Sequence, residues 1–214
     1  MHLKIDHIIY AVHDLEAGMD TIEKLLGERP YYGGQHPNQG THNALLSLGE
    51  DVYLEIIAKD PDQPSPSVPR SFGLDKLAQP RLVTWAVRTH DMPATIAEAR
   101  ANGYNPGERV AGGRNRADGR PLFWESTKRP ESLTGKTPPG DWLIPFIIDW
   151  GGTPHPAEGQ PSHAHLVSLT ATHPNPTAVQ EILHALDLHL EVEEGEEAAL
   201  IATIDGLNGR ITLR

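Results

Sequence analysis

The amino-acid sequence predicts an α+β fold built from repeated β-α-β-β-β units. The main observation is a strand-like apolar run that recurs along the chain and is followed, after a constant interval, by a helix start. The pattern has three copies, in which a strand residue stands seven positions before the residue that opens the helix: His7 and Asp14, Thr84 and Asp91, and His165 and Thr172. Three copies with similar helix starts indicate a repeated unit.

The first unit opens with a strand over residues 4–12 and a helix that starts at Asp14. Alternation along the strand places His7 on a face that otherwise carries apolar side chains. Asp14 is a good N-cap, apolar residues recur with a helical period up to Leu26, and Gly27 stands where a left-handed C-cap is expected. The strand is therefore predicted to turn an imidazole toward the interior.

The rest of this unit is a set of strands. Residues 31–40 read as a loop or an irregular strand, and the runs 43–48 and 51–58 predict a hairpin with a short Gly-containing turn. The first β-α-β-β-β module thus spans residues 1–60. A segment rich in proline follows, and it predicts a crossover linker over 61–80.

The second module is predicted over 81–156. It contains a strand at 82–87, a helix that opens at Asp91, and a loop rich in Gly and Arg at 112–116. A strongly apolar strand at 143–150 closes it, and the proline within that strand indicates a sheet edge or a bulge.

Residues 162–214 predict a third, partial βαββ unit. Its strands are expected at 164–171, 198–204 and 209–213, with one helix after the first of them. The glutamates on either side of Gly195 are predicted to form a solvated turn. All three units are expected to form one compact domain.

Composition excludes several classes of function. The net charge of -11 argues against nucleic acid or an anionic membrane as a partner, since both require basic patches. The chain has no cysteine, which excludes disulfides and thiolate chemistry. Neither a signal-like segment nor a membrane-spanning apolar run is found, so the cytoplasm is the expected location.

His7 and Glu55 are the sharpest candidate pair, because both stand in the middle of apolar strands. A buried carboxylate is destabilising unless it is paired or ligated. One histidine and one carboxylate suit Zn, Mn, Fe or Co, although stable binding needs further ligands. Three interpretations stay open: metal ligation, a structural hydrogen-bonded pair, or a Glu55 side chain at an exposed edge.

The sequence resembles the vicinal oxygen chelate superfamily, and more closely its glyoxalase-like domain branch. The segments that carry the resemblance are 6–15, 40–43 and 53–55 in the first module, and 114–119, Trp124 and 145–150 in the second. The resemblance implies paired β-α-β-β-β modules whose sheets curl into an open barrel. It also implies a central site that often holds a divalent metal (here Zn, Mn, Ni or Fe).

Metal ligands in this superfamily come from the first and last strands of two modules. The resemblance implies that His7 and Glu55 are the metal ligands of the first module. The second module departs from the pattern, with Thr84 at the first position and Ile148 or Asp149 at the second.

The third unit offers an alternative metal ligand. His165 stands at the position of His7 in this unit, and it is either a third ligand or a strand-start histidine near solvent. A metal-free site is the other expectation.

Six further residues are predicted to line a substrate pocket. The arginines could bind a carboxylate or another oxyanion through two hydrogen bonds, and the tryptophans could supply flat apolar surface. Alternatively, the arginines could be surface residues and the tryptophans core residues. These pocket candidates are His36, Asn43, Arg114, Arg116, Trp124 and Trp150.

Three functions are compatible with these residues. The first is a metal-assisted lyase, isomerase or dioxygenase that acts on a small oxygen-rich substrate, with Glu55 as a catalytic residue and Asp149 or Glu125 as a further base. The second is a metal-free protein that binds or sequesters a small molecule. The third is a protein whose modules serve mainly to form a homodimer.

Overall fold

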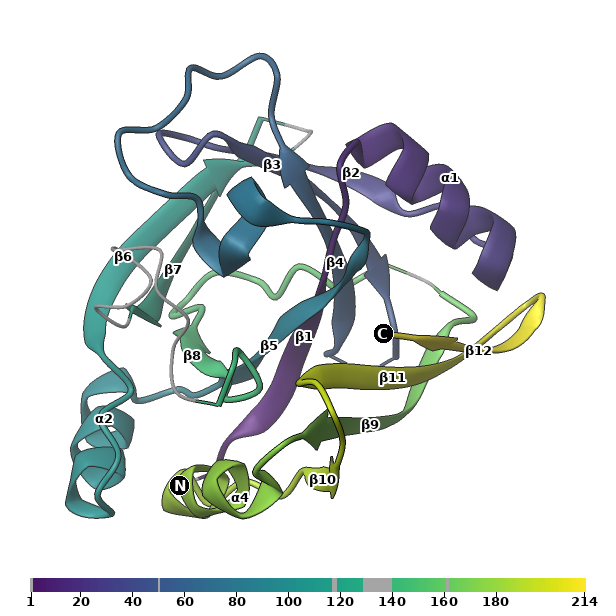
Figure 1. Cartoon of the computed structure of the whole chain (residues 1–214). Coiled ribbons are helices and arrows are strands. Elements are labelled where there is room, and N and C mark those ends of the chain that lie inside the picture. Colours follow the sequence, from purple (N-terminus) through teal and green to yellow (C-terminus); the bar gives the residue numbers. More distant parts are fainter. Residues whose placement is uncertain (1, 50, 117–118, 129–139, 161) are drawn as a thin grey trace.

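The computed structural model describes residues 2–49, 51–116, 119–128, 140–160 and 162–214. Its strands form an eight-stranded sheet of order β2-β3-β4-β1-β5-β8-β7-β6 and a four-stranded sheet of order β10-β9-β11-β12. The larger sheet is strongly curled (Figure 1). This architecture confirms the predicted α+β class with its curled mixed sheet.

The first module supplies one half of the large sheet. Its elements are β1 (Lys4–Ala11), α1 (Leu15–Leu26), β2 (Tyr31–His36), β3 (Thr41–Ser47) and β4 (Tyr53–Lys59). The predicted caps of α1 are present: Asp14 accepts a hydrogen bond from the Ala17 amide at 2.8 Å, and Gly27 has a left-handed φ of 82°. The apolar stripe of α1 packs against the outer face of the sheet.

The second module supplies the other half. Its elements are β5 (Arg81–Arg88), α2 (Met92–Ala101), β6 (Glu108–Asn115), β7 (Pro121–Lys128) and β8 (Phe146–Asp149). The apolar run predicted as a strand over 143–150 is shorter in the structure, because β8 begins only after Pro145. Residues 117–118 of the 114–119 segment lie outside the described residues.

The two modules join through an antiparallel pairing of β1 with β5 at the centre of the sheet. The far edges, β2 and β6, also meet, since Nη1 of Arg114 on β6 donates a hydrogen bond to the Gly33 carbonyl on β2. A side chain at Gly34 would collide with the Asn115 main-chain oxygen, which shows how closely the edges approach. The sheet therefore curls nearly into a barrel.

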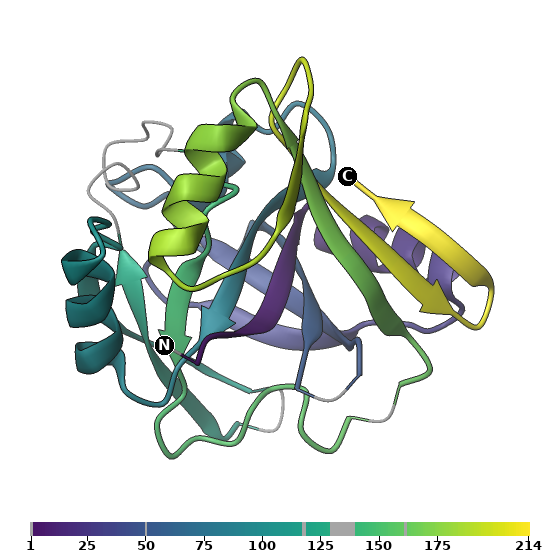
Figure 2. The same cartoon turned by 90° about the horizontal axis from the view of Figure 1, so that it is seen from below.

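The third unit packs on the outside of this sheet (Figure 2). Its elements are β9 (His165–His173), α4 (Pro176–Ala185), β10 (Glu191–Glu194), β11 (Ala199–Gly206) and β12 (Gly209–Leu213). The helix begins later than expected, because β9 continues through Thr172 and the N-cap is Asn175.

The acidic segment of the third unit begins as a strand, β10, and the exposed turn predicted around Gly195 is confined to the residues after it, Glu196 and Glu197. β10 pairs in parallel with β9, and Val192 is buried while the glutamates beside it are exposed. The unit thus has one strand more than predicted, and β9 lies between β10 and β11. No such arrangement occurs in the two modules, where the first strand pairs with the last.

The linker between the modules crosses the inner side of the curl. It includes the short helix η1 (Ser71–Lys76), whose Leu74 side chain is buried against Ile9, Ala11 and Ile57. Among the described residues, no helix is long and apolar enough to cross a membrane.

Candidate functional site

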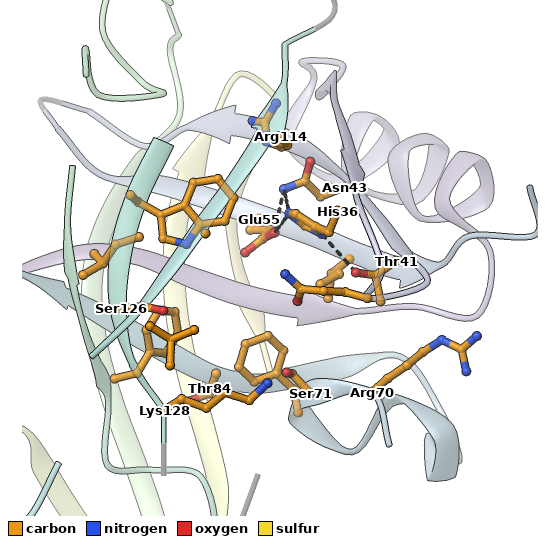
Figure 3. A pocket seen from close by; sticks show the side chains of 18 of the residues that line it. His36, Thr41, Asn43, Glu55, Arg70, Ser71, Thr84, Arg114, Ser126 and Lys128 are labelled. Atoms are coloured by element: carbon orange, nitrogen blue, oxygen red, sulfur yellow. Dashed lines mark hydrogen bonds and ion pairs between the residues drawn. The ribbon is translucent and has the colours of Figure 1, made fainter. Parts of the chain in front are cut away.

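A cavity of about 250 Å³ lies inside the curl of the large sheet. Both modules and the linker line it, and its polar and aromatic side chains point inward from the surrounding strands (Figure 3). The volume suits a small molecule.

Asp6 and His7 form a hydrogen-bonded pair at the start of β1. Neighbours on a regular strand point to opposite faces, but the β1–β5 register shifts between Ile5 and His7, which leaves Asp6 as an extra residue. Oδ1 of Asp6 lies 2.6 Å from Nδ1 of His7.

Two further residues contact the Asp6 carboxylate. Nε1 of Trp150 donates to Oδ2 at 3.0 Å, and Nε2 of His155 lies 3.1 Å from the same oxygen. Burial by itself would raise the pKa of Asp6, but hydrogen bonds from His155 and His7 outweigh it and hold this pKa well below its ordinary value. Contacts to both carboxylate oxygens therefore hold the Asp6 side chain in place.

This contact assigns the hydrogen on Nδ1 of His7. An ionised Asp6 only accepts hydrogen bonds, so Nδ1 of His7 donates to it. The other ring nitrogen, Nε2, lies 3.7 Å from Oε2 of Glu55. The imidazole is also stacked on the Tyr53 ring, with centroids 4.6 Å apart. The ring is therefore held with Nε2 toward Glu55.

Glu55 is buried on β4 beside a small polar network. Nδ2 of Asn43 donates to Oε1 of Glu55 at 2.6 Å and lies 3.4 Å from Nε2 of His36. Burial lowers the pKa of His36, which keeps this imidazole neutral, and its Nδ1 lies 3.0 Å from the Thr41 hydroxyl. In the described part of the chain, Oδ1 of Asn43 is a buried acceptor without a partner.

Arg114 is a buried cation at the edge of this network. Its guanidinium lines the cavity and bonds the Gly33 carbonyl. Burial lowers the pKa of Arg114, and the Glu55 carboxylate acts in the opposite direction. The cavity therefore has a positive group near its carboxylate.

Aromatic rings form the walls. Trp124 and Trp150 lie 5.7 Å apart between centroids, and Phe146 is stacked at 5.9 Å on Phe72 from the linker. The linker also supplies Pro66, Val68, Pro69, Arg70, Ser71 and Leu74 to the lining. A flat apolar group of a ligand would have ring faces on two sides.

The structure brings most of the predicted site residues together. His7, Glu55, His36, Asn43, Arg114, Trp124 and Trp150 all line the cavity. The expectation that Arg116 belongs to the pocket is not met, because it lies outside this lining and donates to the Pro154 carbonyl at 2.8 Å.

Asp149 and Glu125 also lie away from the cavity, and His165 lies where its second interpretation, a strand-start histidine near solvent, placed it. His165 is exposed on β9 of the smaller sheet, because the third unit packs on the outside of the curl and does not repeat the modules. Asp149 accepts a hydrogen bond from the Gly151 amide, and Glu125 pairs with Arg109 near solvent. None of the three is part of the cavity lining.

Several residues of the site were missed by sequence reasoning. Asp6 was not among the candidates, because a bulge cannot be read from alternation. His155 lies in the loop between β8 and β9, and only the fold brings it to Asp6. The remaining signal, an acidic residue directly before a strand histidine, is too short to be specific.

The donor set does not fit a divalent metal centre. His7 and Glu55 converge, but Thr84 bonds the Trp142 carbonyl at 2.9 Å and Ile148 is apolar. At Glu55, the Asn43 amide group donates to Oε1, and the other oxygen, Oε2, faces His7. Within the described ranges, no group of three or more His, Asp or Glu side chains is arranged to hold a metal.

A curled sheet of two βαβββ modules around an internal cavity is the architecture that the resemblance to the vicinal oxygen chelate superfamily implied. A sequence model of the glyoxalase-like domain matches residues 5–186, and the chain belongs to this family. The resemblance inferred from the sequence is thereby confirmed. No curated protein matches the chain.

Solved structures share the fold. A hypothetical protein from Staphylococcus aureus is 18% identical with a TM-score of 0.63, over 99% of this chain and 84% of that chain. Methylmalonyl-CoA epimerase from Mycobacterium tuberculosis is 21% identical with a TM-score of 0.43, over 70% of this chain and 88% of that chain. The Streptomyces coelicolor epimerase in complex with 2-nitronate-propionyl-CoA is 18% identical with a TM-score of 0.44, over 70% and 98%. Identities this low show the fold alone.

Proposed function

We propose that this glyoxalase-like protein is a lyase or isomerase that moves a proton on a small oxygen-rich substrate, with His7 and Glu55 as its acid–base pair. The observation that carries the proposal is the placement of an imidazole nitrogen and a carboxylate oxygen, Nε2 of His7 and Oε2 of Glu55, 3.7 Å apart inside a cavity. A shared proton between them is favourable, and a substrate proton can supply it.

The proposed step begins at a carbon next to a carbonyl group. Glu55 accepts the proton from this carbon, and the C–H electron pair moves into the carbonyl to give an enolate oxygen. Arg114 supplies positive potential near this charge. Return of a proton from His7 or Glu55 completes an isomerisation, while loss of a leaving group from the neighbouring carbon completes an elimination.

Asp6 is a positioning residue in this scheme. It fixes the ring orientation and the tautomer of His7, and it stabilises the imidazolium that forms when Nε2 takes a proton. Trp150 and His155 in turn fix Asp6.

The dioxygenase alternative has less support. An oxygen-activating iron site uses two histidines and one carboxylate with open positions. Here the Asn43 amide nitrogen stands within 2.6 Å of Glu55 and 3.4 Å of His36.

A metal-free binding or sequestering protein is the second candidate. The aromatic walls and the unpartnered Oδ1 of Asn43 favour it, since both would serve a ligand that undergoes no reaction. Deuterium exchange distinguishes the two. In ²H₂O, the enzyme should exchange the carbon-bound protons of 2-oxobutyrate, 4-phenyl-2-oxobutyrate or dihydroxyacetone, followed by NMR.

Glu55→Gln should reduce this exchange by at least about 10²-fold while ligand binding persists. Saturable binding without exchange above the buffer rate would establish the binding protein and reject the enzyme. The unit boundaries (1–60, 61–80, 81–156 and 162–214), a homodimer and a cytoplasmic location stay predictions from the sequence.

A further inference from the structure

The cavity lining has the opposite charge balance from the whole chain. The protein carries a net charge of -11. Among the described residues, in contrast, the lining contains one acidic residue, Glu55, and three basic ones, Arg70, Arg114 and Lys128. An excess of cations inside an acidic protein attracts an anionic ligand.

Two of these cations already have partners. Nη1 of Arg70 bonds Asp75 at 2.7 Å and its Nε bonds the Gly40 carbonyl at 2.9 Å. Arg114 bonds the Gly33 carbonyl and faces Glu55. Neither needs a ligand to balance its charge.

Lys128 differs from both arginines. It makes no ion pair with any described residue, and Glu108, its cross-strand neighbour on β6, is bonded at 2.7 Å by Arg100 instead. Lys128 ends β7, and the period of the strand places it on the same face as Trp124 and Ser126. Its ammonium group is therefore available to the cavity.

Two hydroxyl groups accompany Lys128. Ser71 from the linker and Ser126 from β7 line the same cavity, and neither side chain makes a hydrogen bond within the described part of the chain. Lys128 and Ser71 lie away from Asn43 and Glu55, across the pocket, and Ser126 lies apart from both of them (Figure 3). The site thus has an acid–base end and a separate end with the Lys128 cation and the Ser71 hydroxyl.

We propose that Lys128 and Ser71 bind a carboxylate group of the ligand, which makes the ligand a small organic acid with an apolar body. One cation and one hydroxyl donor match the single charge of a carboxylate. The aromatic side chains that line the same cavity would hold the apolar body. The position of the reacting carbon rests on the proposed function, whereas the carboxylate subsite stands without it.

The test compares an acid with its uncharged analogue. Phenylacetate and phenylacetamide are titrated into the full chain, and binding is followed by the fluorescence of Trp124 and Trp150, which line the cavity. Phenylacetate should bind about tenfold or more tightly than phenylacetamide, because hydrogen bonds to charged groups are the stronger ones. The preference should weaken as salt is added.

Lys128→Met should remove this preference while leaving the affinity for phenylacetamide unchanged. Lys24→Met on the exposed side of α1 is the matched control and should keep the preference. Equal affinities of acid and amide for the wild-type protein, no binding of phenylacetate at millimolar concentration, or an unchanged preference in Lys128→Met would each overturn the proposal. Tighter binding of phenyl phosphate than of phenylacetate would overturn the carboxylate assignment.

Failure of this proposal is distinguishable from failure of the proposed function. Glu55→Gln tests proton transfer and should leave the preference for acid over amide intact. If no substrate exchanges its protons but Lys128→Met still abolishes the preference, the carboxylate subsite stands and the protein binds acids without reacting with them.

Discussion

Nε2 of His7 lies 3.7 Å from Oε2 of Glu55, and Asp6 keeps the imidazole hydrogen on the opposite nitrogen. When His7 is neutral and Glu55 is a carboxylate, both facing atoms are acceptors. In that state a ligand that brings a proton between them is favoured in the cavity.

Acid should weaken the contribution of Asp6 to stability. A carboxyl group whose pKa is lower in the folded state stabilises the protein above its unfolded pKa, and this contribution is lost as pH falls through the folded value. Asp6→Asn should therefore lower the free energy of unfolding by about 2–4 kcal/mol at neutral pH. The difference in free energy of unfolding between the wild-type protein and Asp6→Asn should narrow when the pH falls below the ordinary carboxyl pKa of 3.8.

Urea denaturation of both proteins at neutral and acidic pH measures this gap. Glu181→Gln, on an exposed position of α4, is the control and should shift stability by less than about 0.5 kcal/mol. A gap that stays constant between neutral and acidic pH would contradict the assignment.

Asn43 and Glu55 should behave as a coupled pair. Asn43→Leu leaves the buried Glu55 carboxylate without its hydrogen-bond donor and should destabilise the fold by about 1–3 kcal/mol. The double variant with Glu55→Leu removes both polar partners and should recover part of that loss. A double-mutant cycle by urea denaturation checks this, and strictly additive effects would show that the two side chains are independent.

Gly112→Ala should impair ligand binding through Trp124. A Cβ at Gly112 would collide with the indole ring, which forms part of the cavity wall. We expect the affinity for phenylacetate to fall by about tenfold. Gly113→Ala is the control on the same strand, because the ring it meets belongs to Phe123, which is 61% exposed and free to move. Equal effects of both substitutions would argue against a wall role for Trp124.

Metal binding should be weak. Since the described donors leave His7 and Glu55 without a third ligand, untagged protein should contain far less than one metal per chain by elemental analysis. Its melting temperature should not respond to Zn, Mn, Ni or Fe(II). A stoichiometric metal that His7→Ala or Glu55→Gln removes would show that further ligands complete the site.

Much of the fold and part of the site followed from local patterns. His7 and Glu55 could be paired because alternation selects the face of each strand, and β1 and β4 are neighbours in parallel register. The role of Asp6 could not be predicted, because it depends on a bulge that changes the face of the strand on which the side chain lies. The contacts of His155 and Lys128 depend on segments distant in sequence, for which periodicity gives no information.

The two interpretations of His165 could not be separated from the sequence. The third unit repeats the order of strand and helix, so its first histidine stands at the position of His7. Its strands, however, pair in another order and on the outside of the curl. Local repetition predicts the elements of a unit, but it does not predict the tertiary position of that unit.

The acidic strand β10 bears on how the molecule avoids aggregation. Exposed strand edges invite pairing with another chain, and β2 and β6, the edges of the large sheet, are covered by their mutual contact. β10 is an edge strand of the smaller sheet, and Glu191, Glu193 and Glu194 are exposed along it. Two such edges brought together would place like charges opposite one another, so this strand protects the folded protein against edge-to-edge association.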